Sequence, residues 1–239
     1  MEFLEKTKYK YLKPSPQTQG IKQPPLESPI NPAYPIIDLS KPKEISVNQT
    51  SLRKAIEKRV SIRNYSNKPL TLDELSWLLW ATQGVKQVVK RPSTLRNVPS
   101  AGARHAIDTY ILVNKIENIK QGLYRYVAIT NQLEQINTEE QIVNKIYEAC
   151  MKQGMIKNSA VTFIWTTTFY RMTWRYGERG MRYIHLDVGH VCQNLYLAAE
   201  AIDCGVCAIA AFDDDALNTI IGLDGENNFT VYLATLGKK

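Results

Sequence analysis

Long apolar runs are absent from this chain of 239 residues. No stretch approaches the roughly 18 consecutive apolar residues of a membrane span. The first residues, MEFLEKTKYKYLK, carry scattered charges and lack the apolar core of a secretory signal. We therefore expect a cytoplasmic protein with no membrane partner.

Cysteine is also scarce, and two of the four cysteines, Cys204 and Cys207, form a C-x-x-C pair. Disulfides are rare in the cytosol. A zinc site would need two more ligands at a suitable spacing, and the nearest candidates, His190 and Cys192, belong to no second paired motif. We predict no metal site and interpret the pair as small buried residues that lead into an apolar strand. A redox pair is the alternative.

The formal net charge of +7 would suit a nucleic-acid partner. However, residues 1–60 hold eleven lysines or arginines and six acids, so most of the excess lies near the N-terminus. No compact basic run is interleaved with aromatic residues. We interpret the charge as a solvated basic arm and predict no nucleic-acid partner. An anionic cofactor or substrate would also favour some positive field.

Proline is concentrated in one segment, because eight of the eleven prolines fall between Pro14 and Pro42. Proline lacks the backbone donor that helices and central strands require. We predict that residues 1–49 form an extended arm lying on the body or on a partner subunit. Residues 50–239 then form the folded domain.

Strand-like and helix-like patterns follow each other in residues 50–239 without a regular strand–helix–strand rhythm, which indicates an α+β fold. Two helices are predicted to begin with capping boxes, at residues 71–74 and 138–141. Residues 85–98 are predicted to be a loop or lid. A long helix at 181–202 is apolar on more than one face, which is typical of a helix in a large core or a dimer interface.

Arg59, Ser61 and Arg63 alternate in a stretch with extended character. Alternate side chains of an extended chain project from one face. Two guanidinium groups that flank a hydroxyl suit a phosphate and the polyol next to it, because arginine binds phosphate oxygens in a bidentate fashion. A charged surface strand would show the same pattern.

Two further motifs are weak when taken alone. The Ser100-Ala101-Gly102 turn would let backbone N–H groups approach a flat ligand. Gly237-Lys238, after the last predicted strand, would bring an ammonium group to a phosphate. An ordinary loop and a frayed basic tail explain these two motifs equally well.

The order of these motifs resembles the nitroreductase superfamily, and within it the SagB-type dehydrogenases. The series is R-x-S-x-R-x-Y at 59–65, W-A-T-Q-G at 80–84, P-S-A-G-A at 99–103, G-L-Y-R-Y at 122–126, a helix beginning M-R-Y-I-H-L-D at 181 and L-G-K at 236–238. The resemblance covers residues 50–239. It implies a central, mostly antiparallel sheet flanked by helices, and an intertwined homodimer with FMN at the subunit interface.

The resemblance also implies roles for individual residues. Arg59, Ser61 and Arg63 would hold the FMN phosphate and ribityl chain, and Lys238 would complete the phosphate site. The other positions that would contact the flavin are Gln83, Ser100, Ala101, Gly102, Ala210 and Ala211.

The chain departs from the family pattern in two places. The resemblance places Arg175-Tyr176 at the position where azoline oxidases of the family carry a Lys-Tyr pair as acid–base residues. Arginine keeps its proton near neutral pH, which disfavours a base role for Arg175 and azoline oxidation with it. Tyr176 is either a proton donor or structural. His105-Ala106 replaces an aromatic-Pro pair, so the substrate side is expected to differ.

The resemblance implies an FMN-dependent oxidoreductase that moves hydride between NAD(P)H and a small acceptor, such as a nitroaromatic compound or a quinone. One alternative is a SagB-type dehydrogenase that oxidises a heterocycle or C–N bond in a peptide or small molecule. A flavin-binding module without turnover is an alternative of another class.

Overall fold

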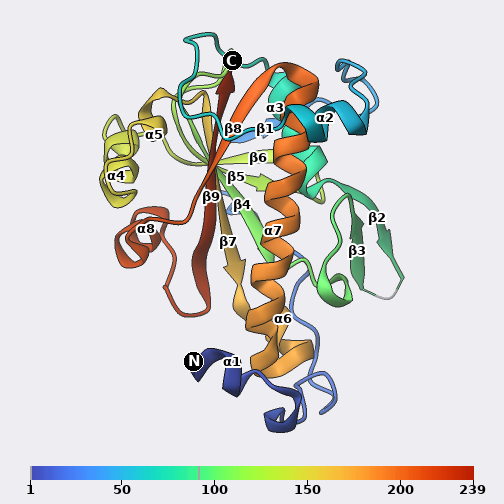
Figure 1. The fold of residues 1–239 in the computed structure, drawn as a ribbon. Coiled ribbons are helices and arrows are strands. Elements are labelled where there is room, and N and C mark those ends of the chain that lie inside the picture. Colours follow the sequence, from blue (N-terminus) through green and yellow to red (C-terminus); the bar gives the residue numbers. More distant parts are fainter. Residues whose placement is uncertain (1, 91) are drawn as a thin grey trace.

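The computed structural model describes residues 2–90 and 92–239, in which a seven-stranded sheet lies between two groups of helices (Figure 1). The strand order is β1-β6-β5-β4-β7-β9-β8, and every neighbouring pair is antiparallel. The predicted α+β fold with an antiparallel central sheet is confirmed. The strands are β1 (Ile36–Asp38), β4 (Ile107–Val113), β5 (Gly122–Val127), β6 (Gln132–Asn137), β7 (Val161–Thr168), β8 (Cys204–Ile209) and β9 (Asn228–Lys238).

Helices cover both faces of this sheet, and the long helix α7 runs along the molecule in front of it (Figure 1). The α-helices are α1 (Glu2–Lys6), α2 (Leu52–Lys58), α3 (Leu72–Gln83), α4 (Ile142–Ala149), α5 (Met155–Asn158), α6 (Phe169–Tyr176), α7 (Gly180–Ala199) and α8 (Asp214–Ile221). The short 3-10 helices are η1 (Tyr9–Tyr11), η2 (Ala101–Ala103), η3 (Gly177–Arg179) and η4 (Glu200–Ile202).

Strand β4 shows how the sheet serves two cores. Ile111 and Val113 join the core that includes Leu75 of α3 and Leu195 of α7, whereas Leu112 joins the core of α4 and α8. Side chains alternate along a strand, so the apolar end of β4, Ile111 to Val113, is buried on both faces. Each fully buried aliphatic side chain stabilises the fold by about 1.5–3 kcal/mol.

The first predicted capping box is confirmed, and the second is wrong. Glu74 N donates to Thr71 Oγ1 at 3.2 Å, and Thr71 N donates to Glu74 Oε2 at 3.0 Å. By contrast, α4 begins at Ile142 and its N-cap side chain makes no capping bond. The backbone N–H of Glu139 instead donates to Asn137 Oδ1 at 2.9 Å, so Asn137 closes a turn before the helix begins.

The prediction of a loop at residues 85–98 is wrong. β2 (Val85–Val89) pairs with β3 (Ser93–Arg96) in a separate antiparallel sheet. The β-branched residues of this segment favour strands. The lysines between them interrupt the regular alternation of apolar and polar residues from which a strand would be predicted. Helix α6 also lacked a sequence signal, because the threonines and aromatic residues of WTTTFYRMTW extend the strand-like pattern of β7.

The N-terminal arm lies on the body of the same chain. Its prolines are all outside helices and strands, as their chemistry requires, and β1 joins the sheet only at the edge, beside β6. The carboxylate of Glu27 accepts hydrogen bonds from Ala128 N at 2.7 Å and Ile129 N at 3.2 Å. Among residues 2–90 and 92–239, no helix has the length and apolar character needed to cross a bilayer.

Candidate functional site

Arg59 and Ser61 meet on the side chain of Tyr196 in α7. The Arg59 guanidinium carbon lies 5.3 Å from the centre of the Tyr196 ring, and Ser61 Oγ lies 3.1 Å from the Tyr196 hydroxyl oxygen. That oxygen also accepts a hydrogen bond from Ala208 N at 2.9 Å. The segment runs parallel to the edge strand β8, where Ile62 N donates to the carbonyl of Val206 at 2.9 Å. The tyrosine therefore ties this segment to α7 and β8.

Arg63 lies against different elements. It borders a hollow of about 380 Å³ whose other walls come from Asn64 and from residues 153–158. Gln153 connects this hollow to the exposed turn after β8, because its amide donates to the carbonyl of Ala211 at 2.9 Å. Ala210 and Ala211 are both exposed there. The side chains of Arg59 and Arg63 donate to no acceptor in the described part of the chain, so both guanidinium groups are available to an anion.

Asp187, near the middle of α7, holds the predicted flavin-ring loop. Ser100 Oγ donates to one carboxylate oxygen of Asp187 at 2.6 Å, and Ala101 N donates to the other at 3.2 Å. Ser100 Oγ also accepts from His105 N at 2.9 Å. Burial raises the pKa of the Asp187 carboxyl, although the two hydrogen bonds oppose this effect. The loop is thus fixed to the same helix that carries Tyr196.

Gly102 brings Arg175 and Tyr176 to this loop. Its φ of 57° is in the left-handed region that favours glycine. A Cβ at this position would lie 2.5 Å from the Tyr176 hydroxyl oxygen and 2.8 Å from Arg175 Nε, so a larger residue would clash. The structure therefore places the loop and the Arg175-Tyr176 pair side by side.

Gln83 is buried behind the loop. Its amide donates to the carbonyl of Ile107 at 3.1 Å and accepts from Arg96 at 3.3 Å. With Ser100 and Asp187 it lines a very small cavity of about 10 Å³, which has room for about one water molecule. The neighbouring Arg96 is also buried, and its Nη2 has no hydrogen-bond partner among the described residues.

His105 lines the same small cavity in an unusual conformation. Its φ is 43°, and its side chain is buried. Burial, together with the positive charges of Arg96 and Arg104, lowers the pKa of the imidazole to about 3. The ring is therefore neutral at pH 7.

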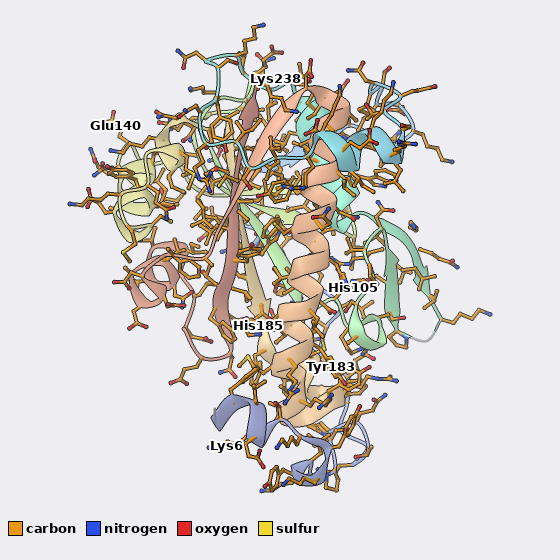
Figure 2. The ribbon with its side chains drawn as sticks, in the orientation of Figure 1. Lys6, His105, Glu140, Tyr183, His185 and Lys238 are labelled. Atoms are coloured by element: carbon orange, nitrogen blue, oxygen red, sulfur yellow. The ribbon has the colours of Figure 1, made fainter. Side chains whose placement is uncertain are left out.

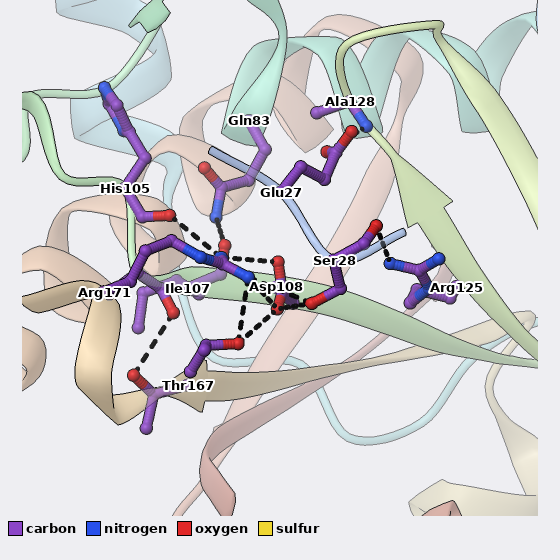
Figure 3. A network of polar contacts seen from close by, with 12 residues as sticks. Glu27, Ser28, Gln83, His105, Ile107, Asp108, Arg125, Ala128, Thr167 and Arg171 are labelled. Atoms are coloured by element: carbon purple, nitrogen blue, oxygen red, sulfur yellow. Dashed lines mark hydrogen bonds and ion pairs between the residues drawn. The ribbon is translucent and has the colours of Figure 1, made fainter. Parts of the chain in front are cut away.

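An ion-pair network connects the back of this region to the arm (Figure 3). Arg171 binds Asp108 at 2.9 Å and also donates to Ser28 Oγ at 3.0 Å. Burial alone would raise the pKa of Asp108, but Arg171, together with Thr168 and Arg125, outweighs it and the pKa is lowered. Arg125 donates to Glu134 at 2.7 Å and to the carbonyl of Ser28 at 2.9 Å. The arm is thus part of the buried polar interior.

The Lys238 side chain lines a different hollow from Arg63, although the carbonyl of Lys238 accepts a hydrogen bond from Ser66 N at 2.9 Å. Its ammonium group is paired with Glu74 and donates to the carbonyl of Ile202 at 2.8 Å. The hollow beside it, of about 340 Å³, is lined by neither Arg59 nor Ser61. Lys238 and Tyr183 lie near opposite ends of α7 (Figure 2).

The cysteine pair has the geometry of core residues. Cys204 and Cys207 are buried in β8, three positions apart, so their side chains point to opposite faces of the sheet. Burial raises the pKa of the Cys204 thiol to about 12. Within residues 2–90 and 92–239, no group of three or more His, Cys, Asp or Glu side chains is arranged to hold a metal ion.

Sequence patterns assigned no site role to four residues of this region: Tyr196, Asp187, Arg96 and His105, the last of which was singled out only as a departure from the family pattern. A signal existed for two of them. Asp187 and Tyr196 are polar residues on the buried side of α7, and a buried polar group needs a partner. His105 and Arg96 gave no such signal, because their burial depends on the β2–β3 hairpin.

Two proteins share sequence similarity with much of this chain. One is a protein of Methanocaldococcus jannaschii named as a nitroreductase, MJ1384, which is 32% identical over 193 residues, covering 81% of this chain and 93% of its own. The other is the trifolitoxin-processing protein TfxB of Rhizobium leguminosarum bv. trifolii, which is 30% identical over 131 residues. That match covers 53% of this chain and 35% of TfxB.

Solved structures share the fold. A protein of Anabaena variabilis described as a nitroreductase is 28% identical, with a TM-score of 0.71 over 87% of this chain; the match spans 42% of the Anabaena chain. A Desulfovibrio desulfuricans protein, also described as a nitroreductase and solved in complex with FMN, is 14% identical, with a TM-score of 0.55 over 80% of this chain and 87% of its own. The sequence profile of the nitroreductase family matches residues 56–238. This chain therefore belongs to the nitroreductase family of oxidoreductases.

Proposed function

We propose that this chain binds FMN along α7 as a homodimer and transfers hydride from NAD(P)H to a small acceptor, such as a nitroaromatic compound or a quinone. One observation carries the proposal. Two clusters of predicted ligands, Arg59–Ser61 and Ser100–Gly102, are tied to the same helix by Tyr196 and Asp187. These two helix positions are about 14 Å apart along the axis, a span that suits a flavin ring with its ribityl phosphate.

The residues present fit such a ligand. The guanidinium groups of Arg59 and Arg63 have free donors for a phosphate, and the loop at Ser100 offers backbone groups to a planar ring. The Desulfovibrio desulfuricans protein with this fold was solved in complex with FMN, which supports FMN as the ligand. When bound, FMN would supply the hydride chemistry, while the protein sets its position and electrostatics.

The chain also supplies a candidate proton donor. The Tyr176 hydroxyl lies against Gly102, and a phenol donates a proton readily when the acceptor is reduced nearby. Arginine is a poor proton acceptor in proteins, so Arg175 is not expected to be the base.

The visible spectrum of the purified protein tests the cofactor. We expect flavin bands near roughly 370 and 450 nm. Arg59→Ala is expected to lose FMN while keeping the wild-type circular dichroism spectrum. Arg53→Ala is the matched control, because Arg53 is an exposed residue of α2 that pairs with Glu57. Wild-type flavin content in Arg59→Ala would show that the phosphate assignment is wrong.

The dimer has its own test. Leu186 is 60% exposed on α7, and the proposed subunit interface would cover it. Light scattering is expected to give twice the 27.2 kDa mass of one chain. A monomer that retains FMN would contradict the shared site.

The similarity to TfxB favours a second candidate, a dehydrogenase that modifies a peptide. That function requires a partner enzyme or precursor peptide, so copurification with such a partner would support it. A flavin-binding module without turnover is the remaining alternative. Anaerobic stopped-flow mixing with NAD(P)H distinguishes it, because a storage module would not bleach.

A further inference from the structure

Four arginines follow one another at intervals of three or four residues where α6 leads into α7, and three of them are engaged. Arg171 is buried in its pair with Asp108. Arg179 donates to the Tyr183 hydroxyl at 2.9 Å and to the carbonyl of Thr7 at 2.8 Å, and Arg182 donates to the Thr7 hydroxyl. Arg175 differs, because no residue in the described part of the chain accepts a hydrogen bond from it or forms an ion pair with it.

Arg175 is nevertheless held in place. Its guanidinium carbon lies 5.5 Å from the centre of the Tyr176 ring, and Tyr176 packs edge-on against Tyr183 with ring centres 4.7 Å apart. Tyr183 is fixed by Arg179 and lies 3.3 Å from the Tyr9 hydroxyl of the N-terminal arm. A guanidinium group stacked on a supported ring is oriented before any ligand arrives.

A second guanidinium group lies near Arg175. The Nε of Arg175 lies close to Gly102, whose carbonyl accepts a hydrogen bond from Arg104 at 3.1 Å. Two guanidinium groups thus converge on the loop that carries Ser100. No carboxylate in residues 2–90 and 92–239 lies within 4.0 Å of Arg175 to offset its charge, whereas Arg125 and Arg171 each have one.

We propose that Arg175 binds the carboxylate of the acceptor, so that the enzyme reduces small aromatic or quinonoid compounds bearing a carboxylate in preference to neutral ones. This inference rests on the proposed function and names its substrate class. The planar fork of arginine matches the two oxygens of a carboxylate, and Tyr176 lies beside it for proton donation to the same molecule. Lysine at this position would supply only a point charge.

A matched pair of acceptors tests the proposal on the flavin-loaded protein. 4-Nitrobenzoate carries the carboxylate, and its methyl ester does not. In Arg175→Gln, we expect the ratio of kcat/KM for the acid to that for the ester to fall about tenfold or more, the size expected for a lost charged hydrogen bond. Arg175→Lys is expected to recover part of the ratio. Arg53→Gln removes a surface charge elsewhere and is expected to keep it.

Binding provides a readout without turnover. Benzoate and benzamide are titrated into the oxidised protein, and the change in flavin absorbance is followed. We expect the wild type to bind benzoate more tightly than benzamide and Arg175→Gln to lose this preference. Equal affinity of the wild type for both probes would overturn the inference.

The two proposals fail in different ways. A wild type that is reduced by NAD(P)H but turns over the acid and the ester equally well overturns the carboxylate site and leaves the proposed function standing. Absence of reduction by NAD(P)H contradicts the proposed function, while benzoate binding still tests Arg175. A third outcome concerns the hydride donor. If Arg175→Gln changes the KM for NADPH but not for NADH and still binds benzoate as the wild type does, then Arg175 binds the extra phosphate of NADPH and the inference is overturned.

Discussion

Two sets of arginines in this protein differ in what they contact. Arg125 and Arg171 are buried, and each is paired with one carboxylate. Arg59, Arg63 and Arg175 have no carboxylate partner in the described part of the chain, although Arg59 and Arg175 are oriented by tyrosine rings. The same side chain is thus used in two ways, and the difference lies in whether its donors are already occupied.

The paired set holds the molecule together, because Arg125 and Arg171 both reach Ser28 of the arm (Figure 3). Of the unpaired set, Arg59 contacts Tyr196 of α7 and Arg175 contacts Tyr176, which packs on Tyr183 of α7, and the proposed ligands would bind there. Buried charges need partners within the fold, whereas Arg59 and Arg175 are half-buried and Arg63 is exposed, so their donors are open to solvent or to a ligand. Mutations that separate stability from binding test this division.

The largest expected effect is on stability, at Glu134. Glu134→Ala would leave the buried Arg125 without its carboxylate, and loss of one partner of a buried ion pair costs about 3–5 kcal/mol. Urea unfolding measures this change in the free energy of unfolding. The control is Glu139→Ala, which removes an exposed partner of Lys145 and is expected to cost less than about 1 kcal/mol. Equal losses in the two variants would refute the division.

His105 gives the next largest effect, and its sign follows from its pKa. The folded pKa of about 3 lies below the ordinary value of 6.5, so between these values the unfolded chain binds more protons. The free energy of unfolding must then fall as pH falls from about 6.5 towards 3. In His105→Phe this dependence is expected to be shallower. Unfolding at several pH values measures it, with His185→Gln, at an exposed position, as the variant that should keep the wild-type slope.

The sequence predicted what local patterns encode. Thr71 and Glu74 are three residues apart, and their capping box is a matter of neighbouring atoms. The extended chain at Arg59–Arg63 and the tight loop at Ser100 were visible for the same reason. The spacing of apolar residues also identified α7 and most of the strands. A helix or strand that packs on a core carries apolar residues at its own structural period.

The rest depends on contacts between distant residues. Asp187 binds Ser100 across 87 positions, and His105 is buried under a hairpin whose strands looked like a loop. Whether Arg63 would share a hollow with Arg59 depended on the path of α5, which no local pattern reveals. The proposed ligand roles themselves came from the order of motifs along the chain, and they stay predictions.

The two predicted phosphate arginines are expected to differ. Arg59 is oriented by Tyr196 beside Ser61, whereas Arg63 borders the hollow near Gln153. We expect Arg59→Ala to weaken FMN binding about tenfold or more, the effect of losing a charged hydrogen bond, and Arg63→Ala to weaken it less. Fluorescence titration of the apoprotein with FMN measures both dissociation constants. A larger loss in Arg63→Ala would place the phosphate in the other hollow.

The smallest effect is expected at Lys238, whose donors are occupied like those of the buried set. Its ammonium group is paired with Glu74 and bound to the carbonyl of Ile202, so a phosphate would have to displace Glu74, which also caps α3. Lys238→Met is therefore expected to lower the free energy of unfolding by about 1 kcal/mol, the upper range for a pair at the surface, and to weaken FMN binding less than Arg59→Ala does. Measuring both quantities on one preparation separates the two roles. If Lys238→Met loses FMN as strongly as Arg59→Ala, then the ion pair opens when FMN binds, and an occupied donor does not by itself mark a structural residue.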